Sequence, residues 1–171
     1  IPRHYGVQNV SNEYIDKLKS GISINLSFNG VLNDKLDQSN VSQKTVDELK
    51  TKGGGILSLP TGYGKTTIAL HVISQIQLKT LIIVHKEFLM NQWIERIKQF
   101  LPHAEIGVIQ GNKIDICKKD IVVGMLQSLS MKTYEKDLFT QFGLTVIDET
   151  HHICAKVFSQ ALMKINTKYM L

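Results

Sequence analysis

The sequence predicts an α/β fold, a doubly wound and mostly parallel sheet with helices on both faces. Two observations support this class. Short apolar runs recur along the chain, and amphipathic helical patterns lie between some of them. Strands that are apolar throughout are typical of a parallel sheet, because helices cover both of its faces. The expected strands of this sheet are 56–59, 81–84, 106–109, 121–123, 144–147 and 169–171.

The first thirty residues are expected to form a mixed, polar lead-in segment, followed by one domain over 31–171. Apolar and polar residues alternate over 22–28, which predicts a half-buried strand near the end of this lead-in. Ser42 is expected to cap a short helix that runs to Lys50. Three glycines at 53–55 then end that helix.

Two longer amphipathic helices are predicted between the later strands, and a final helix follows residue 150. Apolar residues recur at helical spacing in each of them. Trp93 is therefore interpreted as a packed helix residue, in preference to a platform for a nucleic-acid base. The inward-facing residues are expected to be Ile68, Val72, Ile73 and Ile76 in the first helix, Leu89, Trp93, Ile97 and Phe100 in the second, and Cys154, Phe158 and Leu162 in the last.

Composition narrows the class of protein. With 171 residues, 43% of them hydrophobic and 20% charged, the chain can form a core, which excludes a disordered tail, a collagen-like repeat and a coiled coil. No apolar run approaches the roughly 18 residues of a membrane span, so no membrane partner is expected. The first residue is Ile1, which suggests a piece cut from a longer polypeptide. The two cysteines, Cys117 and Cys154, lack metal or redox spacing, so we expect reduced thiols and an intracellular location, in the cytoplasm or nucleus.

The net charge of +5 favours a polyanionic partner only weakly. Almost all of the positive charge is lysine, and the only arginines are Arg3 and Arg96. Proteins that recognise base edges, or that supply their own arginine finger, usually carry more arginine.

A glycine-rich loop directly follows the expected strand 56–59 and leads into a helix. Glycines let backbone N–H groups converge on phosphate oxygens, and the helix N-terminus adds free donors. Lys65 is expected to reach the β- and γ-phosphates of a nucleotide, and the Thr66 hydroxyl to bind Mg²⁺. Leu59 stands where the general pattern has its first glycine, a departure that a tighter loop tolerates. The loop consists of Pro60, Thr61, Gly62, Tyr63, Gly64, Lys65, Thr66 and Thr67.

An acidic pair, Asp148 and Glu149, follows the expected strand 144–147. Ligands of open parallel sheets bind at the carboxyl ends of the strands, so this pair can face the phosphate loop. Asp148 is expected to hold Mg²⁺ through water, and Glu149 to orient and deprotonate an attacking water. No zinc site is expected at the two histidines that follow, because partners at ligand spacing are missing. His151 is interpreted as a link between the hydrolytic centre and a neighbouring element.

The phosphate loop and the Asp-Glu-x-His sequence that begins at Asp148 resemble the first RecA-like domain of superfamily 2 helicases of the DExH type. Within that family the chain is most similar to transcription and repair helicases and to the related helicases of large DNA viruses. Other landmarks agree: His85-Lys86 with the following Gln92-Trp93, the glycine turn at Gln110-Gly111, and Gln127-Ser128.

The resemblance implies a RecA-like, ATP-binding domain over 31–171, with ATP and Mg²⁺ as cofactors and single- or double-stranded nucleic acid, DNA favoured, as partner. It places backbone contacts to nucleic acid at His85, Lys86, Gln127 and Ser128. It also implies a second RecA-like domain that supplies arginine fingers and lies outside this chain, so the chain alone should be nearly inactive. The family often has an adenine-contacting Gln upstream of the loop. Leu36 stands at that position, with Gln38 and Gln43 nearby.

Two alternatives to a helicase remain open from the residues. One is another phosphotransferase with this loop, such as a nucleotide kinase or a GTPase. Neither calls for a late Asp-Glu-x-His, and a GTPase should also carry an Asn-Lys-x-Asp sequence that specifies guanine. The other is a catalytically incomplete nucleic-acid-binding module, which the presence of Lys65, Asp148 and Glu149 disfavours.

Overall fold

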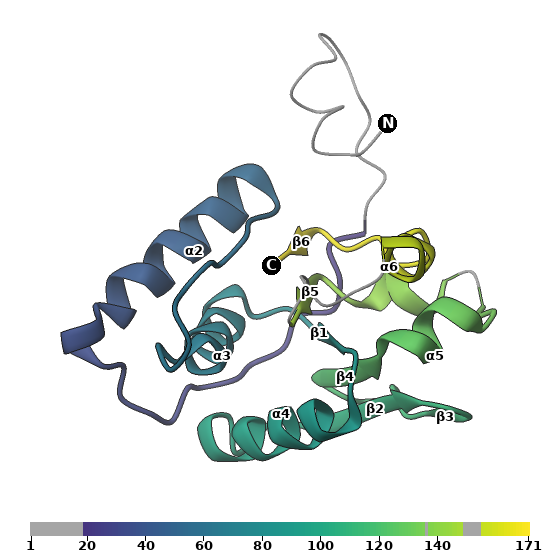
Figure 1. Ribbon diagram of the computed structural model, residues 1–171, viewed down its shortest axis with the longest axis horizontal. Coiled ribbons are helices and arrows are strands. Elements are labelled where there is room, and N and C mark those ends of the chain that lie inside the picture. Colours follow the sequence, from purple (N-terminus) through teal and green to yellow (C-terminus); the bar gives the residue numbers. More distant parts are fainter. Residues whose placement is uncertain (1–18, 136, 149–154) are drawn as a thin grey trace, which may run out of the picture.

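The computed structural model describes residues 19–135, 137–148 and 155–171, and it contains a six-stranded sheet between two layers of helices (Figure 1). The strand order is β3-β2-β4-β1-β5-β6. Neighbouring strands are parallel except for the antiparallel β2–β3 hairpin, so the predicted α/β class is confirmed. The strands are β1 (Thr80–Val84), β2 (Ile106–Gln110), β3 (Lys113–Ile114), β4 (Ile121–Met125), β5 (Leu144–Ile147) and β6 (Tyr169–Met170).

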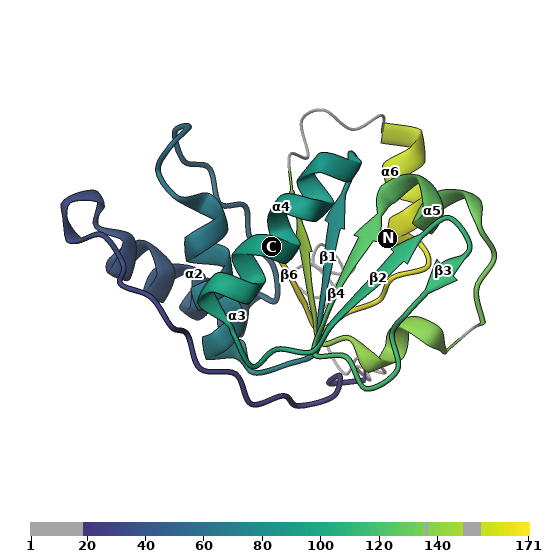
Figure 2. The same ribbon diagram turned by 90° about the horizontal axis from the view of Figure 1, so that it is seen from below.

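Helices cover both faces of the sheet, as Figure 2 shows. On one face lie α3 (Lys65–Ile76) and α4 (Glu87–Phe100), with α2 (Gln38–Lys52) packed against α3. The other face is covered by α5 (Leu126–Met131) and α6 (Ala155–Leu162). Two 3₁₀ turns complete the described part, η1 (Asp34–Leu36) and η2 (Leu138–Gln141). None of the helices in these ranges combines the length and apolarity that a bilayer span requires.

The central strand β1 explains why the strands are apolar throughout. Successive side chains of a strand point to opposite faces of the sheet. Ile82 and Val84 join the core beneath α3 and α4, whereas Leu81 and Ile83 join the core beneath α5 and α6. All four side chains are fully buried. The sheet therefore separates two hydrophobic cores, and both depend on β1.

The helix predicted from Ser42 to Lys50 is longer than expected. It begins four residues earlier, at Gln38, after the η1 turn and a left-handed Asp37 (φ 49°). Ser42 is not its cap. The side chain of Ser42 is buried inside the interface with α3, where its hydroxyl hydrogen-bonds His71 Nδ1 at 2.7 Å. The cap prediction was wrong because the helix begins upstream of Ser42, which therefore lies inside it and bonds His71 of the neighbouring helix.

The strand predicted over 22–28 is an extended segment without a ladder, apart from one isolated bridge between Ser23 and Leu78. The alternation holds over 24–28, where Leu26 is buried and Ser27 is exposed, but not at Ile22, which is 53% exposed. Beyond this bridge and the backbone hydrogen bonds of Ile22 and Ile24 beside it, the Gln77 side chain holds the segment. Gln77 Oε1 accepts from the Leu26 N–H at 3.0 Å, and Gln77 Nε2 donates to the Leu26 carbonyl at 2.7 Å. This pair of hydrogen bonds replaces part of a strand–strand ladder.

The strand predicted over 56–59 is also not formed. Immediately before it, Gly54 makes one parallel bridge to Met170 of β6. Two hydrogen bonds fasten this bridge, from the Met170 N–H to the Gly53 carbonyl and from the Gly55 N–H to the Met170 carbonyl, both at 3.0 Å. Beyond it, the described residues supply no neighbouring strand, and Ile56 is 93% exposed. Apolar composition predicted the strand, but a ladder also requires a partner.

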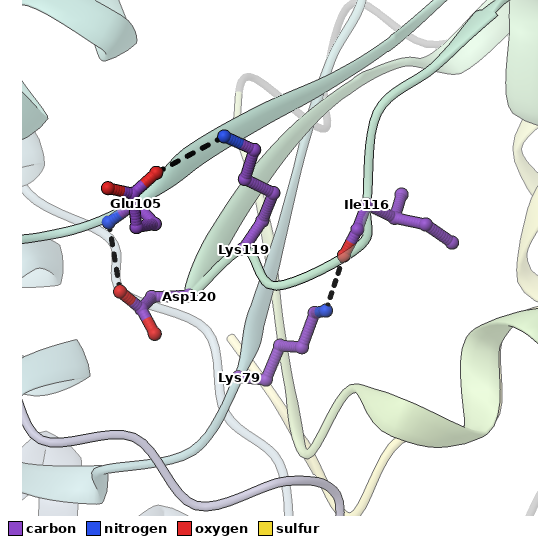
Figure 3. Close-up of polar contacts among 5 residues, drawn as sticks. All are labelled: Lys79, Glu105, Ile116, Lys119 and Asp120. Atoms are coloured by element: carbon purple, nitrogen blue, oxygen red, sulfur yellow. Dashed lines mark hydrogen bonds and ion pairs between the residues drawn. The ribbon is translucent and has the colours of Figure 1, made fainter.

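A network of polar contacts closes the amino-terminal edge of the sheet (Figure 3). Lys79, which precedes β1, is 3% exposed, and its Nζ donates to the Ile116 carbonyl at 2.6 Å. Burial lowers the pKa of Lys79, and the charge of Asp120 opposes this effect. Asp120 also accepts from the Glu105 N–H at 2.9 Å, while Lys119 forms an ion pair with Glu105 at 3.2 Å. These contacts connect the three segments that directly precede β1, β2 and β4.

Candidate nucleotide site and nucleic-acid edge

The phosphate loop makes its turn with two glycines in the left-handed region, Gly62 (φ 81°) and Gly64 (φ 87°). A side chain at Gly64 would also displace Gln38, because an added Cβ would lie 2.6 Å from Gln38 Nε2. Gly64 is the N-cap residue of α3 and makes no side-chain cap hydrogen bond. The first N–H groups of a helix have no partner within it, so this turn presents donors suited to phosphate oxygens.

Lys65, Thr66 and Asp148 line the same pocket, which has a volume of about 320 Å³. Lys65 and Thr66 are the first two residues of α3, and Asp148 comes directly after β5 at the carboxyl edge of the sheet. The backbone holds Asp148 there, since its N–H donates to the Ile83 carbonyl of β1 at 3.0 Å. The topology thus brings together three residues that the sequence predicted as parts of one site. The apolar side of the pocket includes Phe158, Leu162, Met170 and Leu171.

Residues upstream in the sequence hold the phosphate loop through hydrogen bonds to Tyr63. Gln38 is 6% exposed, and its Nε2 donates to the Tyr63 carbonyl at 2.7 Å. Its Oε1 accepts from the Asn33 N–H at 2.8 Å. The Tyr63 hydroxyl donates to the Leu36 carbonyl. Gln38 is therefore the upstream glutamine in contact with the loop, whereas Gln43 lies on the exposed face of α2.

The residues present fit a magnesium nucleotide. Lys65 Nζ donates to the Leu59 carbonyl at 3.1 Å, and an ammonium group has two further N–H donors for phosphate. Thr66 offers a hydroxyl and Asp148 a carboxylate within the pocket, the oxygen ligands that Mg²⁺ takes. The described residues contain no cluster of three or more acidic, histidine or cysteine ligands. This donor set suits an ion that keeps most of its water and also binds phosphates.

The predicted nucleic-acid residues come together beside this pocket, at the carboxyl ends of β1 and β4. Gln127 Nε2 donates to the His85 carbonyl at 3.0 Å, which ties the start of α5 to the end of β1. Ser128 Oγ accepts from the Gly111 N–H at 2.9 Å, which links the start of α5 to the turn after β2 as well. Lys86 is exposed, with its Nζ 5.8 Å from the centre of the Phe88 ring. Phe88, 61% exposed, was not singled out in the sequence.

The other loop positions lie around the turn. Thr61 and Gly62 are exposed, and Thr67 is half-buried in the first turn of α3. Glu149 and His151 lie outside the described residues.

The Asn-Lys-x-Asp sequence expected of a GTPase does occur, at residues 112–115. It forms the turn and edge strand β3, at the opposite side of the sheet from β6. Asn112 Oδ1 accepts from Lys132 Nζ at 2.6 Å, so its amide oxygen already has a partner. Four strands separate β3 from β6, whose Met170 lines the nucleotide pocket. This placement does not suit a base contact at the pocket.

Two interactions of the site have no local signal in the sequence. Trp93 is packed, as predicted, at 3% exposure, but its Nε1 also donates to Asp148 Oδ2 at 2.8 Å. Gln38 contacts the loop from a position two residues after the expected one. Both contacts join segments far apart in the sequence, and only the fold brings them together.

Two curated viral proteins are similar to this chain. A protein of Acanthamoeba polyphaga mimivirus named as an ATP-dependent RNA helicase is 38% identical over 173 residues, which cover 100% of this chain and 33% of that protein. A protein of Invertebrate iridescent virus 6 named as a helicase is 31% identical over 157 residues, covering 87% of this chain and 34% of that one. The chain spans about a third of the length of these curated relatives.

Solved structures show the same fold. The SWI2/SNF2 ATPase core of Sulfolobus solfataricus, solved in complex with double-stranded DNA, has a TM-score of 0.71 and 25% identity, covering 90% of this chain and 33% of that one. The UvsW helicase of bacteriophage T4 has a TM-score of 0.66 and 25% identity, covering 89% of this chain and 55% of that one. The predicted similarity to superfamily 2 helicases is confirmed.

The family assignment rests on a match to a family model over most of the chain. The family model described as type III restriction enzyme, res subunit, matches residues 11–171. This range includes the phosphate loop, the acidic pair and the residues at the ends of β1 and β4. The chain therefore belongs to the family of the type III restriction enzyme res subunit, a family of helicase ATPase domains.

Proposed function

We propose that this chain binds and hydrolyses ATP as the motor domain of a nucleic-acid-dependent helicase or translocase, with DNA as the favoured substrate. The observation that carries the proposal is the pocket shared by Lys65, Thr66 and Asp148, next to the joined ends of β1 and β4. In this proposal the nucleotide and the nucleic acid bind at the same edge of the sheet. A nucleotide kinase or GTPase would not need the second group of residues.

The proposed roles follow from chemistry. Lys65 binds the β- and γ-phosphates, and Thr66 and Asp148 hold Mg²⁺, with Asp148 acting through water. Mg²⁺, when bound, neutralises charge on the transferred phosphoryl group. Glu149 positions and deprotonates the attacking water, and His151 links that centre to a neighbouring element. Backbone amides of Gly62, Gly64 and the first turn of α3 receive the remaining phosphate oxygens.

Two further partners belong to the proposal. A second RecA-like domain supplies arginines for the developing charge, because Arg96, the only arginine among the described residues, does not line the nucleotide pocket. Without that contribution, on the order of 10³-fold in rate, the chain alone hydrolyses ATP slowly. Nucleic acid and ATP as substrates suit an intracellular protein of the cytoplasm or nucleus, and viral relatives named as helicases support this proposal.

Replacing Lys65 by Ala tests the nucleotide site. The wild-type chain should gain thermal stability as MgADP or MgATP is raised above its Kd, since a ligand that binds only the folded state stabilises it. Lys65→Ala should lose this gain and its heat of binding in calorimetry. Lys50→Ala, which changes an exposed lysine on α2, is the matched control and should respond like the wild type. Equal responses from wild type and Lys65→Ala would contradict the proposal.

A further inference from the structure

A hydrogen bond between an indole and a carboxylate crosses from α4 to the end of β5. Trp93 Nε1 donates to Asp148 Oδ2 at 2.8 Å, although 55 positions separate the two residues. Trp93 is 3% exposed and packs with Met90 and Ile97 on the buried face of α4. The ring is therefore held by its helix and by the core, independently of any contact with the carboxylate.

The contact restricts the carboxylate of Asp148. An indole N–H can only donate, and the acceptor that it meets in this buried position is Asp148 Oδ2. By engaging Oδ2, it selects one orientation of the Asp148 side chain and leaves the other oxygen for a ligand. Trp93 and Asp148 also line the same pocket as Lys65 and Thr66, so this orientation is set within the nucleotide site.

We propose that Trp93 is a positioning residue for magnesium: its N–H holds the Asp148 carboxylate in the orientation that receives the Mg²⁺ of a bound nucleotide. The inference rests on the proposed function, because it assumes that Asp148 is the Mg²⁺ residue. Groups that orient metal-binding carboxylates typically contribute 10- to 100-fold to metal affinity. The sequence pattern explains only the burial of Trp93, whereas this proposal explains its N–H.

Calorimetry on the 171-residue chain tests the inference with Trp93→Phe, which keeps an aromatic ring but removes the N–H. ADP is titrated once with Mg²⁺ and once with EDTA. The variant should bind ADP in EDTA like the wild type, but the gain in affinity from Mg²⁺ should fall about 10-fold or more. Ile97→Val, which removes one methyl group from the same buried helix face, is the control for packing and should keep the whole Mg²⁺ gain.

A spectroscopic measurement needs no variant of Trp93. The chain has one tryptophan, so a nitrogen–proton correlation spectrum contains a single indole N–H signal. With ADP at saturation, adding Mg²⁺ should shift this signal in the wild type, and Asp148→Asn should abolish the shift. An indole signal that does not respond to Mg²⁺ in the wild type overturns the inference, even if Trp93→Phe fails to fold.

The outcomes separate the two proposals. If Asp148→Asn removes the Mg²⁺ gain but Trp93→Phe keeps it, Trp93 has no positioning role, although the proposed site stands. If the wild type binds no nucleotide, or if Asp148→Asn keeps the Mg²⁺ gain, the proposed site is itself wrong and the inference fails with it. Loss of the Mg²⁺ gain in Trp93→Phe and Asp148→Asn, but not in Ile97→Val, supports both.

Discussion

Several side chains at the carboxyl edge of the sheet support the local structure and also face the proposed ligands. Lys65 bonds the Leu59 carbonyl while its remaining N–H groups are free to bind phosphate. Gln127 holds the end of β1 through the His85 carbonyl. Because these side chains hold the local structure at the edge where ligands are proposed to bind, variants there require a measurement of folding beside each measurement of binding.

His71 gives the fold a dependence on pH. It lies on α3, where its ring meets the edge of Phe28, with centroids 5.1 Å apart, and bonds Ser42 Oγ at 2.7 Å. Burial lowers the pKa of His71 below its usual value of 6.5. The unfolded chain therefore takes up a proton at a higher pH than the folded chain does, and stability from this residue is lost as pH falls.

We predict that the chain unfolds at lower denaturant concentration as pH falls below 6.5, until the lowered pKa of His71 is passed. Above pH 6.5 both states hold His71 neutral, and its contribution is constant. His71→Gln, which cannot take up the proton, should flatten this part of the profile in urea unfolding followed by circular dichroism.

The exposed His103 provides the control for the pH profile. His103→Gln should retain the wild-type dependence on pH. A profile that is equally steep in the wild type and in His71→Gln would show that another group causes the loss of stability.

Among the secondary-structure elements, hydrophobic periodicity correctly predicted those that pack into one of the two cores. Strand β5 was predicted at its observed bounds, and the buried faces of α3 and α4 were predicted from residues such as Ile68 and Ile97. The prediction of strands over 22–28 and 56–59 was wrong because composition alone does not provide a neighbouring strand. Their apolar composition is real, but a strand also needs a partner, and no local pattern states which backbone lies beside it.

The candidate site follows the same division. Lys65, Thr66 and Asp148 could be predicted because the carboxyl ends of parallel strands share one edge. The contact of Gln38 with Tyr63 joins segments that are distant in sequence, as does that of Trp93 with Asp148. Such side-chain hydrogen bonds require donor–acceptor distances within about 2.7–3.2 Å, and periodicity does not determine them.

We predict that Gln77→Ala loosens the attachment of the extended segment 22–28. The half-buried Gln77 side chain bonds both backbone groups of Leu26, and removing it leaves these groups without their partner. The free energy of unfolding should fall by about 1–3 kcal/mol, the usual cost of unpaired buried polar groups. Urea unfolding gives this value directly. Gln75→Ala, at an exposed position in the last turn of α3, should change it little, and equal values for the two variants would show that the Gln77 hydrogen bonds to Leu26 do not hold the segment.

For the molecule as a whole, the two edges of the sheet have opposite properties. The amino-terminal edge is closed by contacts among its own residues, such as that of Lys79 with the Ile116 carbonyl. The carboxyl edge carries the phosphate loop, Asp148 and the exposed Lys86, and its pocket opens among α3, α4 and α6. A ligand that spans the molecule would therefore be expected along the carboxyl edge, where polar groups from several strands converge.

We predict that the chain binds single-stranded oligonucleotides weakly, without sequence preference, and more weakly as salt is raised. Backbone contacts position a strand without identifying its bases, and each neutralised phosphate contributes a slope of about −0.7 in the logarithm of affinity against the logarithm of salt concentration. Lys86→Ala should lower affinity about equally for different sequences and flatten this slope by about 0.7. Fluorescence titrations at several salt concentrations measure both the affinity and the slope.

The control variant is Lys98→Ala, which removes an exposed lysine from the far end of α4 and should leave the slope unchanged. A strong preference for one sequence, or an unchanged slope in Lys86→Ala, would move the nucleic-acid contact away from the end of β1.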